Sequence, residues 1–397
     1  MRAYDFDTEI QRISTDSVKW DAQVIKNLVG TTTDLPMWVA DMDFTAPPEV
    51  IEAFKKRAEH GVFGYPGPHA IEKTMDSFYG WTENRHHWVP QEGSVTYSPG
   101  MLTSISLFLD QLSSPGDKVV IQTPAYQPFF NLIEMNKRIV VENPLNYDPV
   151  LHRYSLDLID LEEHLKDPLT TMMIFCSPHN PAGRVWTEAE LQQVLVLCDR
   201  YHVQIISDEI HADLVYEPFS HSPLSKLGKD LLLPPITCMA PSKTFNIAGE
   251  HFSLTVIPDQ KSREVYRKAL RRLSLSHPGV LILQAVRAAY DHGGPWLDEL
   301  LIYLQGNLEL MEERMSRLES ISLIKPEASF ISFLDATRLE ARTEEKSISA
   351  YIAEKTGVAL HDGTWFGERG KGFLRMNFGT QRSRLIRALD RFEHAGL

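Results

Sequence analysis

Up to about Pro258, short and nearly continuous apolar runs alternate with longer amphipathic segments. Apolar runs of this kind predict strands covered on both faces, and the amphipathic segments between them predict helices, a pattern typical of a parallel sheet. Thr187, followed by Glu190, predicts the capped start of a helix over 188–201. The predicted strands are 94–98, 118–122, 138–142, 171–176, 203–207, 236–240 and 252–257, and the other predicted helices are 101–111 and 128–135.

After Pro258 the pattern changes to long helices followed by mixed elements. We therefore expect an α/β protein in which a mostly parallel, doubly wound large domain carries a smaller α+β domain. The first 45 or so residues show no periodic element of their own and should pack on the smaller domain. The predicted elements are helices 261–273, 279–290, 295–318, 344–355 and 381–395 and strands 329–334 and 372–378; the predicted domains are 46–285 (large) and 1–45 with 286–397 (smaller).

Composition narrows the classes of function. The chain has 397 residues, with 40 Lys and Arg against 53 Asp and Glu, for a net charge of −13. Such an acidic chain is a poor candidate for binding nucleic acid or an anionic membrane. Cys176, Cys198 and Cys238 are too far apart for a CxxC metal or redox motif, so we expect buried, reduced thiols and no metal site. With neither a signal-peptide pattern at the N-terminus nor a membrane-length apolar run, the expected location is the cytoplasm.

Candidate chemistry follows the predicted strands, because ligands of doubly wound sheets bind at the carboxyl ends of the strands. Gly100 opens a helix after the first strand, where free backbone N–H groups favour an anion such as phosphate. Tyr126 follows the second strand and could stack on a flat ring, although for this residue alone a core aromatic is the favoured interpretation. Asn180 lies in the rigid loop 177–183, where its amide could donate to an oxyanion or serve only the turn.

Two charged residues complete this set of strand ends. Asp208 ends a buried strand, where a carboxylate is costly unless it is paired, either with a cationic ring nitrogen or in a structural ion pair. Lys243 follows another buried strand between small and apolar residues, which suits an amine with a lowered pKa that can form an imine. A single lysine would be assigned to the solvated surface, so it is the convergence of the strand ends that indicates a site.

The ordered set of motifs resembles the fold-type I pyridoxal 5′-phosphate (PLP) enzymes, the aspartate aminotransferase superfamily. Within it, the chain is most similar to the C–S lyases that include cystathionine β-lyase-like proteins and cystalysin. The resemblance runs essentially end to end, and its most specific blocks are Ser-Pro-His-Asn-Pro and Pro-Ser-Lys-Thr-Phe-Asn. The matching segments are 39–44 (VADMDF), 64–68 (GYPGP), 175–186 (FCSPHNPAGRVW), 207–211 (SDEIH) and 240–249 (APSKTFNIAG).

The resemblance implies a role for each residue that holds the cofactor. Lys243 would form the Schiff base with PLP and then take the substrate Cα proton. Asp208 would pair with the pyridine nitrogen, Asn180 would donate to the phenolate oxygen, and Tyr126 would stack on the ring and belong to the catalytic set. The residues implied in holding the phosphate and the remainder of the cofactor are Gly100, Met101, Leu102, Ser242 and His211.

The resemblance also implies how substrate and subunits are arranged. Arg375 would take the substrate carboxylate as a bidentate fork, with Ala40 beside the substrate. Tyr65 would reach the phosphate and substrate of the neighbouring subunit, which implies a homodimer with shared active sites.

Three departures from the family pattern concern the substrate more than the cofactor. Many aminotransferases of this superfamily place a phosphate-binding Arg shortly after the lysine, but 244–257 contains none. Glu250 and His251 stand where apolar or amide residues are expected, and a carboxylate so near the phosphate would be unfavourable unless it pointed away. Gln127 replaces a tyrosine of cystalysin-like proteins.

These observations favour a C–S β-lyase that converts cystathionine or a related S-substituted cysteine to a thiol, pyruvate and ammonia. An aminotransferase is the alternative, because it begins with the same loss of the Cα proton. A regulatory or interaction protein on the same fold is a third possibility, which the complete set of catalytic residues disfavours. The sequence leaves open which S-substituted cysteine is the substrate.

Overall fold

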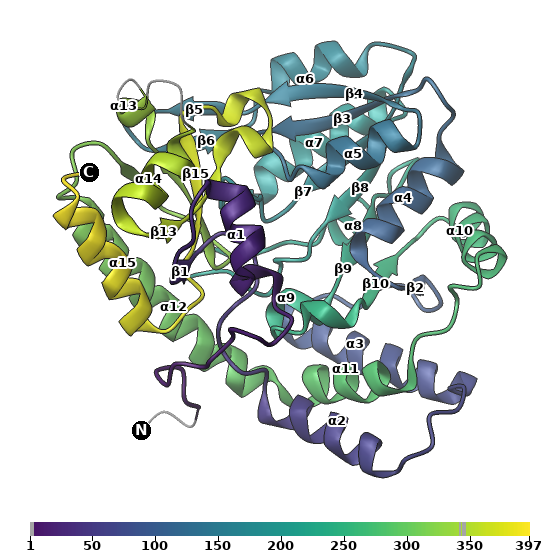
Figure 1. The fold of residues 1–397 in the computed structure, drawn as a ribbon. Coiled ribbons are helices and arrows are strands. Elements are labelled where there is room, and N and C mark those ends of the chain that lie inside the picture. Colours follow the sequence, from purple (N-terminus) through teal and green to yellow (C-terminus); the bar gives the residue numbers. More distant parts are fainter. Residues whose placement is uncertain (1–3, 341–342, 344–346) are drawn as a thin grey trace.

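A seven-stranded sheet forms the centre of the computed structural model, which describes residues 4–340, 343 and 347–397 (Figure 1). The strand β10 runs antiparallel to both of its neighbours, β2 and β9, and the other pairs are parallel. The predicted mostly parallel sheet is therefore confirmed. In spatial order the strands are β2 (Val95–Ser98), β10 (Ser253–Val256), β9 (Ile236–Met239), β8 (Gln204–Asp208), β7 (Thr170–Cys176), β3 (Lys118–Thr123) and β4 (Ile139–Pro144).

Helices cover both faces of this sheet, and the alternation of side chains along β7 explains why. Met172 and Ile174 enter one buried cluster, whereas Met173 and Phe175 enter another on the opposite face. A strand that is buried on both faces must be apolar at consecutive positions, which is the pattern seen in the sequence. The first cluster includes α4 (Met101–Leu112), α5 (Pro128–Met135) and α10 (Gln260–Arg272); the second includes α6 (Leu158–Leu165), α7 (Glu188–Arg200) and α8 (Leu224–Leu227).

The predicted cap of α7 is present. The Thr187 hydroxyl accepts a hydrogen bond from the Glu190 backbone N–H at 3.2 Å, and the Glu190 carboxylate accepts one from the Thr187 N–H at 2.7 Å. This reciprocal pairing satisfies two N–H groups that a helix start otherwise leaves without partners.

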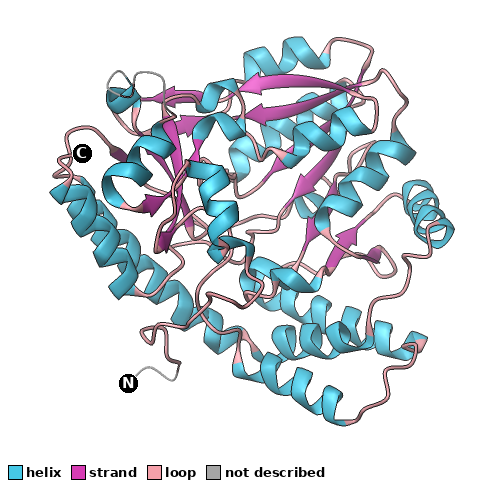
Figure 2. Cartoon of the chain, in the orientation of Figure 1, coloured by secondary structure: helices cyan, strands magenta, loops and turns pink. Residues whose placement is uncertain are grey.

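A second, antiparallel sheet lies beside the first and is built mostly from the C-terminal third of the chain (Figure 2). The predicted helix 344–355 falls partly outside the described residues, and α14 begins at Ile348 behind the capping Ser347. The sheet order is β11 (Ser322–Ile324), β12 (Ile331–Asp335), β15 (Phe373–Asn377) and β14 (His361–Asp362), accompanied by α12 (Gly294–Met315), α14 (Ile348–Thr356) and α15 (Arg382–His394). The domain boundaries given above stay predictions.

The absence of a periodic element in the first 45 residues is a prediction that was wrong. The helix α1 (Ala22–Val29) begins behind Asp21, whose carboxylate caps two backbone N–H groups, and ends at Gly30 in the left-handed conformation (φ 78°). These two flanking residues were the available signal. The short strand β1 (Leu35–Pro36) then pairs with β13 (Val358–Ala359), which joins the N-terminal segment to the C-terminal part of the chain.

Two further helices were not predicted from the sequence, α2 (Pro48–Glu59) and α3 (Pro68–His86), and both pack against α11 (Val280–His292). The segment between them carries Tyr65. The glycine-rich stretch 367–372 contains the short helix η4 (Glu368–Gly370). Within the described ranges, no helix combines the length and apolar character that crossing a membrane requires.

Candidate active site

A cavity of about 290 Å³ opens at the carboxyl ends of the strands of the large sheet. Strands β2, β3, β7, β8 and β9 each provide a wall residue at their last residue or within a few residues after it, as the sequence predicted. The structure brings most of the predicted site residues together here. Those that line the cavity are Ala40, Gly100, Met101, Leu102, Tyr126, Asn180, Asp208, His211, Ser242 and Lys243.

Lys243 lies in the short helix α9 (Pro241–Thr244), directly after β9. Its Nζ donates a hydrogen bond to the carbonyl oxygen of Ala40 at 2.5 Å. Burial lowers the pKa of Lys243 to about 8, although Asp41 and Asp208 attract the charged form. About a tenth of the amine is therefore neutral and nucleophilic at pH 7, far more than for an ordinary lysine, as imine chemistry requires.

Asp208 is the last residue of β8 and is 5% exposed. Its Oδ1 accepts a hydrogen bond from the Ile210 backbone N–H at 3.1 Å. Burial raises the pKa of Asp208 to about 6, which the hydrogen bond from Ile210 and the nearby Lys243 only partly offset. A carboxylate in this position gains from a cationic partner delivered by a ligand.

The loop that carries Asn180 is held by its own backbone. The His179 N–H donates to the Arg184 carbonyl at 2.8 Å, and the Gly183 N–H donates to the His179 carbonyl at 2.7 Å. Gly183 has a φ of +69°, and a Cβ at this residue would lie 2.6 Å from the Cβ of Pro326, so only glycine fits. The loop therefore fixes Asn180 at the cavity wall.

Arg375, on β15 of the smaller sheet, does not itself line the cavity but contacts Asn180, which does. Its Nη1 donates a long hydrogen bond of 3.4 Å to Oδ1 of Asn180, and its Nη2 donates to the Trp38 carbonyl at 2.9 Å. Burial lowers the pKa of Arg375 to about 10, and its Nε is a buried donor with no hydrogen-bond partner in the described part of the chain. An unpaired guanidinium donor beside the cavity suits a substrate carboxylate.

Three residues around Arg375 were not identified from the sequence. Phe366 places its ring 4.8 Å from the guanidinium carbon, and His361 and Trp365 also lie against the guanidinium. Burial lowers the pKa of His361, so its ring is neutral and adds no positive charge beside Arg375. No motif pointed to these aromatic residues, because aromatic side chains in a core carry the same sequence pattern.

The candidate phosphate cradle is the first turn of α4. Gly100 caps this helix with a φ of +140°, a conformation that L side chains rarely adopt. Ser242 lines the same cavity across from it. Backbone N–H groups at a helix start bind phosphate, and the absence of a Cβ at Gly100 lets an anion approach them.

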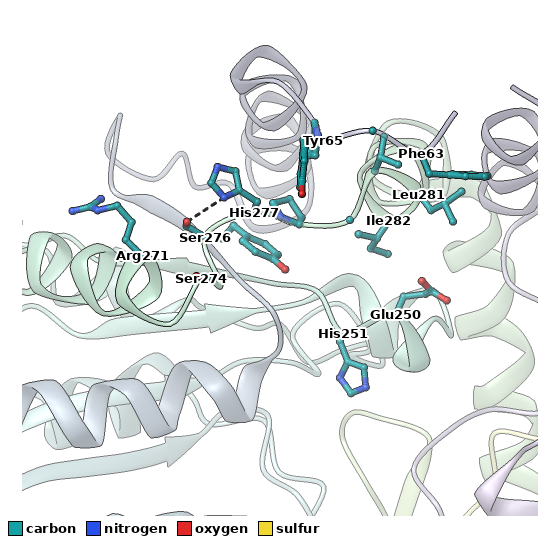
Figure 3. Close-up of a pocket in the computed structure, with 16 residues that line it drawn as sticks. Phe63, Tyr65, Glu250, His251, Arg271, Ser274, Ser276, His277, Leu281 and Ile282 are labelled. Atoms are coloured by element: carbon teal, nitrogen blue, oxygen red, sulfur yellow. Dashed lines mark hydrogen bonds between the residues drawn. The ribbon is translucent and has the colours of Figure 1, made fainter. Parts of the chain in front are cut away.

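The remaining predicted residues differ in where the structure places them. Tyr126 lines the cavity, and burial raises its phenol pKa. His211 pairs its Nδ1 with the Ser329 hydroxyl at 3.1 Å, and burial lowers its pKa to about 3, which keeps the ring neutral. Tyr65 is not in this cavity: its side chain is fully exposed and lines a separate cavity of about 1190 Å³ (Figure 3).

A buried hydrogen-bond network behind Lys243 was also not predicted from the sequence. The Asp213 carboxylate accepts hydrogen bonds from the Thr244 hydroxyl at 2.8 Å, from the Trp81 indole at 3.0 Å and from His86 at 2.8 Å. Thr244 directly follows Lys243, so this network anchors α9 to α3. Trp81 and His86 are more than a hundred positions from Asp213 in sequence, so the spacing of residues along the chain gives no signal for these contacts.

The residues present fit PLP on three structural observations. Asp208 is a buried carboxylate with a raised pKa, which suits a protonated ring nitrogen. Lys243 has the lowered pKa of an imine-forming amine. Gly100 has no side chain, so the helix start that follows it is open to an anion.

The comparisons with known proteins agree with this geometry. The family described as "Aminotransferase class I and II" matches residues 35–392. Cystathionine beta-lyase PatB of Bacillus subtilis is 41% identical over 392 residues, which cover 98% of this chain and 99% of that protein. The structure of cystalysin from Treponema denticola, which contains a PLP cofactor, superimposes with a TM-score of 0.92 at 31% identity and covers 99% of this chain and 98% of its own.

A PLP-bound C-S lyase from Staphylococcus hominis superimposes with a TM-score of 0.89 at 27% identity, over 99% of this chain and 98% of its own. The likeness therefore extends over the whole length of the chain and includes both sheets. From the family match, the cavity at the strand ends and the full-length similarity, the chain belongs to the aminotransferase class I and II family, with the fold-type I architecture of PLP enzymes.

Proposed function

We propose that this protein is a PLP-dependent C–S β-lyase that acts on cystathionine or a related S-substituted cysteine. The observation that carries the proposal is that a partly desolvated amine, Lys243, and the buried carboxylate of Asp208 line the same cavity. The 41% identity to a cystathionine beta-lyase and the likeness to cystalysin support the reaction type.

The cofactor would be held by groups on both sides of the cavity. The N–H groups at the start of α4, together with Ser242, receive its phosphate, and the Asp208 carboxylate receives its ring nitrogen. Asn180 lies where its amide can donate to the ring oxygen, and Tyr126 supplies an aromatic face. When bound, PLP supplies an electrophilic carbonyl carbon and a ring that withdraws electrons from the substrate Cα.

The chain's own residues perform the remaining steps. Arg375 binds the substrate carboxylate through its unpaired Nε–H and its Nη groups, which orients the Cα–H bond. The neutral Lys243 amine accepts the Cα proton. The Cβ–S bond then breaks, the electron pair leaves with sulfur as a thiolate, and the three-carbon remainder takes up water to give pyruvate and ammonia.

An aminotransferase would use the same residues to the point at which Lys243 holds the Cα proton. In the lyase reaction sulfur leaves Cβ, whereas in transamination Lys243 would deliver the proton to a carbon of the cofactor. The absence of Arg in 244–257 and the named relatives support the lyase. A regulatory role on the same fold is less well supported, because the proposed catalytic residues Lys243, Asp208 and Tyr126 line one cavity.

Product analysis tests the proposed reaction. We expect the holoenzyme to convert cystathionine, cystine and other S-substituted cysteines to pyruvate and ammonia in equal amounts, with release of the corresponding sulfur product. Alanine, which lacks a leaving group on Cβ, should give no pyruvate above a slow background. Coupled pyruvate detection and a thiol reagent measure both products. Pyruvate formation from alanine as fast as from cystathionine would contradict the proposal.

We further propose that the protein is a homodimer with shared active sites and that it works in the cytoplasm. The fully exposed Tyr65 supports a shared site, because an aromatic side chain on a large open cavity suits a neighbouring subunit. The three cysteines are free and buried, which fits a reducing compartment.

Mixing inactive protomers tests the shared site. Lys243→Ala and Tyr65→Ala homodimers should each have little activity, but subunit exchange between them should restore up to about a quarter of wild-type turnover, because half of the dimers are then hybrids with one intact site. Differently tagged protomers measure the exchange, and Lys243→Ala mixed with itself is the control. Complete exchange without recovered activity would count against the shared site.

A further inference from the structure

His251 lies at the boundary between the active-site cavity and the larger cavity that contains Tyr65. It follows the short helix η2 (Ala248–Glu250) and lines both cavities, whereas Glu250 lines only the larger one. Figure 3 shows the Glu250 and His251 side chains pointing in opposite directions. The carboxylate, which would repel a phosphate, is thus directed away from the active-site cavity, and the imidazole borders it.

The imidazole of His251 is close to the proposed phosphate cradle. A Cβ built on Gly100 would lie 3.8 Å from the Nδ1 of His251. His251 therefore stands over the helix start that presents free N–H groups to an anion, on the same cavity as Ser242 and Leu102. No other element of this chain brings a ring nitrogen that close to Gly100 among the contacts of the described residues.

A phosphate bound in this cradle needs more positive charge than a helix start supplies. The helix dipole amounts to about half a charge, whereas a phosphate monoester carries nearly two negative charges at neutral pH. Residues 244–257 contain no Arg or Lys, and the amine of Lys243 is consumed by imine formation. His251 is the residue in this segment whose ring nitrogen lies beside the cradle, and an imidazole N–H can donate a hydrogen bond to a phosphate oxygen.

We propose that His251 binds the cofactor phosphate through a hydrogen bond from its imidazole, in a segment that contains no Arg or Lys. This inference rests on the proposed PLP-dependent function and concerns a residue to which that function assigned no role. Its consequence is that part of the affinity for PLP, and none of the affinity for pyridoxal, depends on His251.

Titration of the full-length apoprotein with PLP and with pyridoxal tests the proposal. His251→Asn removes the ring, and Asn tolerates the left-handed backbone at this residue (φ 36°). His251→Arg supplies a permanent cation. The matched control is His202→Asn, because His202 is also exposed, also left-handed (φ 57°) and borders neither cavity. Absorbance of the bound cofactor gives each dissociation constant.

We expect His251→Asn to weaken PLP binding about tenfold or more relative to wild type, because a hydrogen bond to a charged group is lost. Pyridoxal, which lacks the phosphate, should bind wild type and His251→Asn equally. His251→Arg should bind PLP at least as tightly as wild type, and His202→Asn should match wild type. Should His251→Asn fail to fold, His251→Gln replaces it with the same expected results.

Two failures can be told apart. If wild type takes up no PLP, the proposed function fails. If wild type binds PLP but His251→Asn binds it equally well, or loses affinity equally for PLP and pyridoxal, the role of His251 is wrong and the proposed function stands.

Discussion

Replacing Lys243 by alanine is expected to reduce turnover of S-substituted cysteines by about four orders of magnitude or more, because it removes both the imine-forming amine and the base for the Cα proton. The substitution should not unfold the protein. Burial lowers the pKa of Lys243 from 10.5 to about 8, so holding the charged amine in the folded state costs about 3 kcal/mol below that pH, a cost that alanine does not carry.

The same lysine is the residue to which the cofactor should attach, and its pKa should set the pH dependence of the attachment rate. After borohydride reduction, peptide mapping of wild type should find the pyridoxyl group on Lys243, and Lys243→Ala should carry none. The rate of PLP attachment to wild type should rise with pH and level off above about 8, where the amine is neutral. Lys261→Ala, a substitution on the exposed start of α10, serves as the control and should behave as wild type. Full turnover in Lys243→Ala would overturn the assignment.

Replacing Asp208 by asparagine is expected to lower kcat by about two to four orders of magnitude while cofactor attachment to Lys243 persists. Asparagine keeps the shape of the side chain and its acceptor for the Ile210 N–H, which lies 3.1 Å from Oδ1, but it removes the negative charge. Without that charge the ring nitrogen loses its proton, and the ring withdraws electrons from Cα less strongly.

The conservative substitution Asp208→Glu separates charge from position. It should retain more activity than Asp208→Asn if charge is the dominant contribution, even though a longer side chain fits the strand end less well. Burial raises the pKa of Asp208 to about 6 in the free protein, so a cationic partner should lower it and keep the carboxylate ionised when the cofactor is bound. Asp208→Asn with wild-type kcat and normal labelling of Lys243 would contradict the role given to the carboxylate.

The sequence located the core of this site because of how a parallel sheet is built. Strands covered on both faces appear as apolar runs, and their carboxyl ends meet at one edge. The sequence alone therefore predicted that Asn180, Asp208 and Lys243 lie close together. The capping box at Thr187 was equally predictable, since both of its hydrogen bonds are local in sequence.

Features that depend on distant contacts could not be predicted in the same way. The position of Arg375 against Phe366 and the Trp38 carbonyl requires the smaller sheet to be folded beside the larger one. The opposite directions of Glu250 and His251 depend on a left-handed residue whose conformation the sequence does not specify. The helix α1 was missed for a different reason: its signals, Asp21 and Gly30, are local, but its apolar face is short.

Steady-state turnover of cystathionine with and without added 2-oxoglutarate tests the central claim most directly. A C–S lyase releases pyruvate, ammonia and thiol on every cycle and needs no amino acceptor, so the account predicts the same rate in both conditions and no accumulation of glutamate. Turnover that strictly requires 2-oxoglutarate, with glutamate formed in proportion to the substrate consumed, would contradict the account and establish an aminotransferase instead.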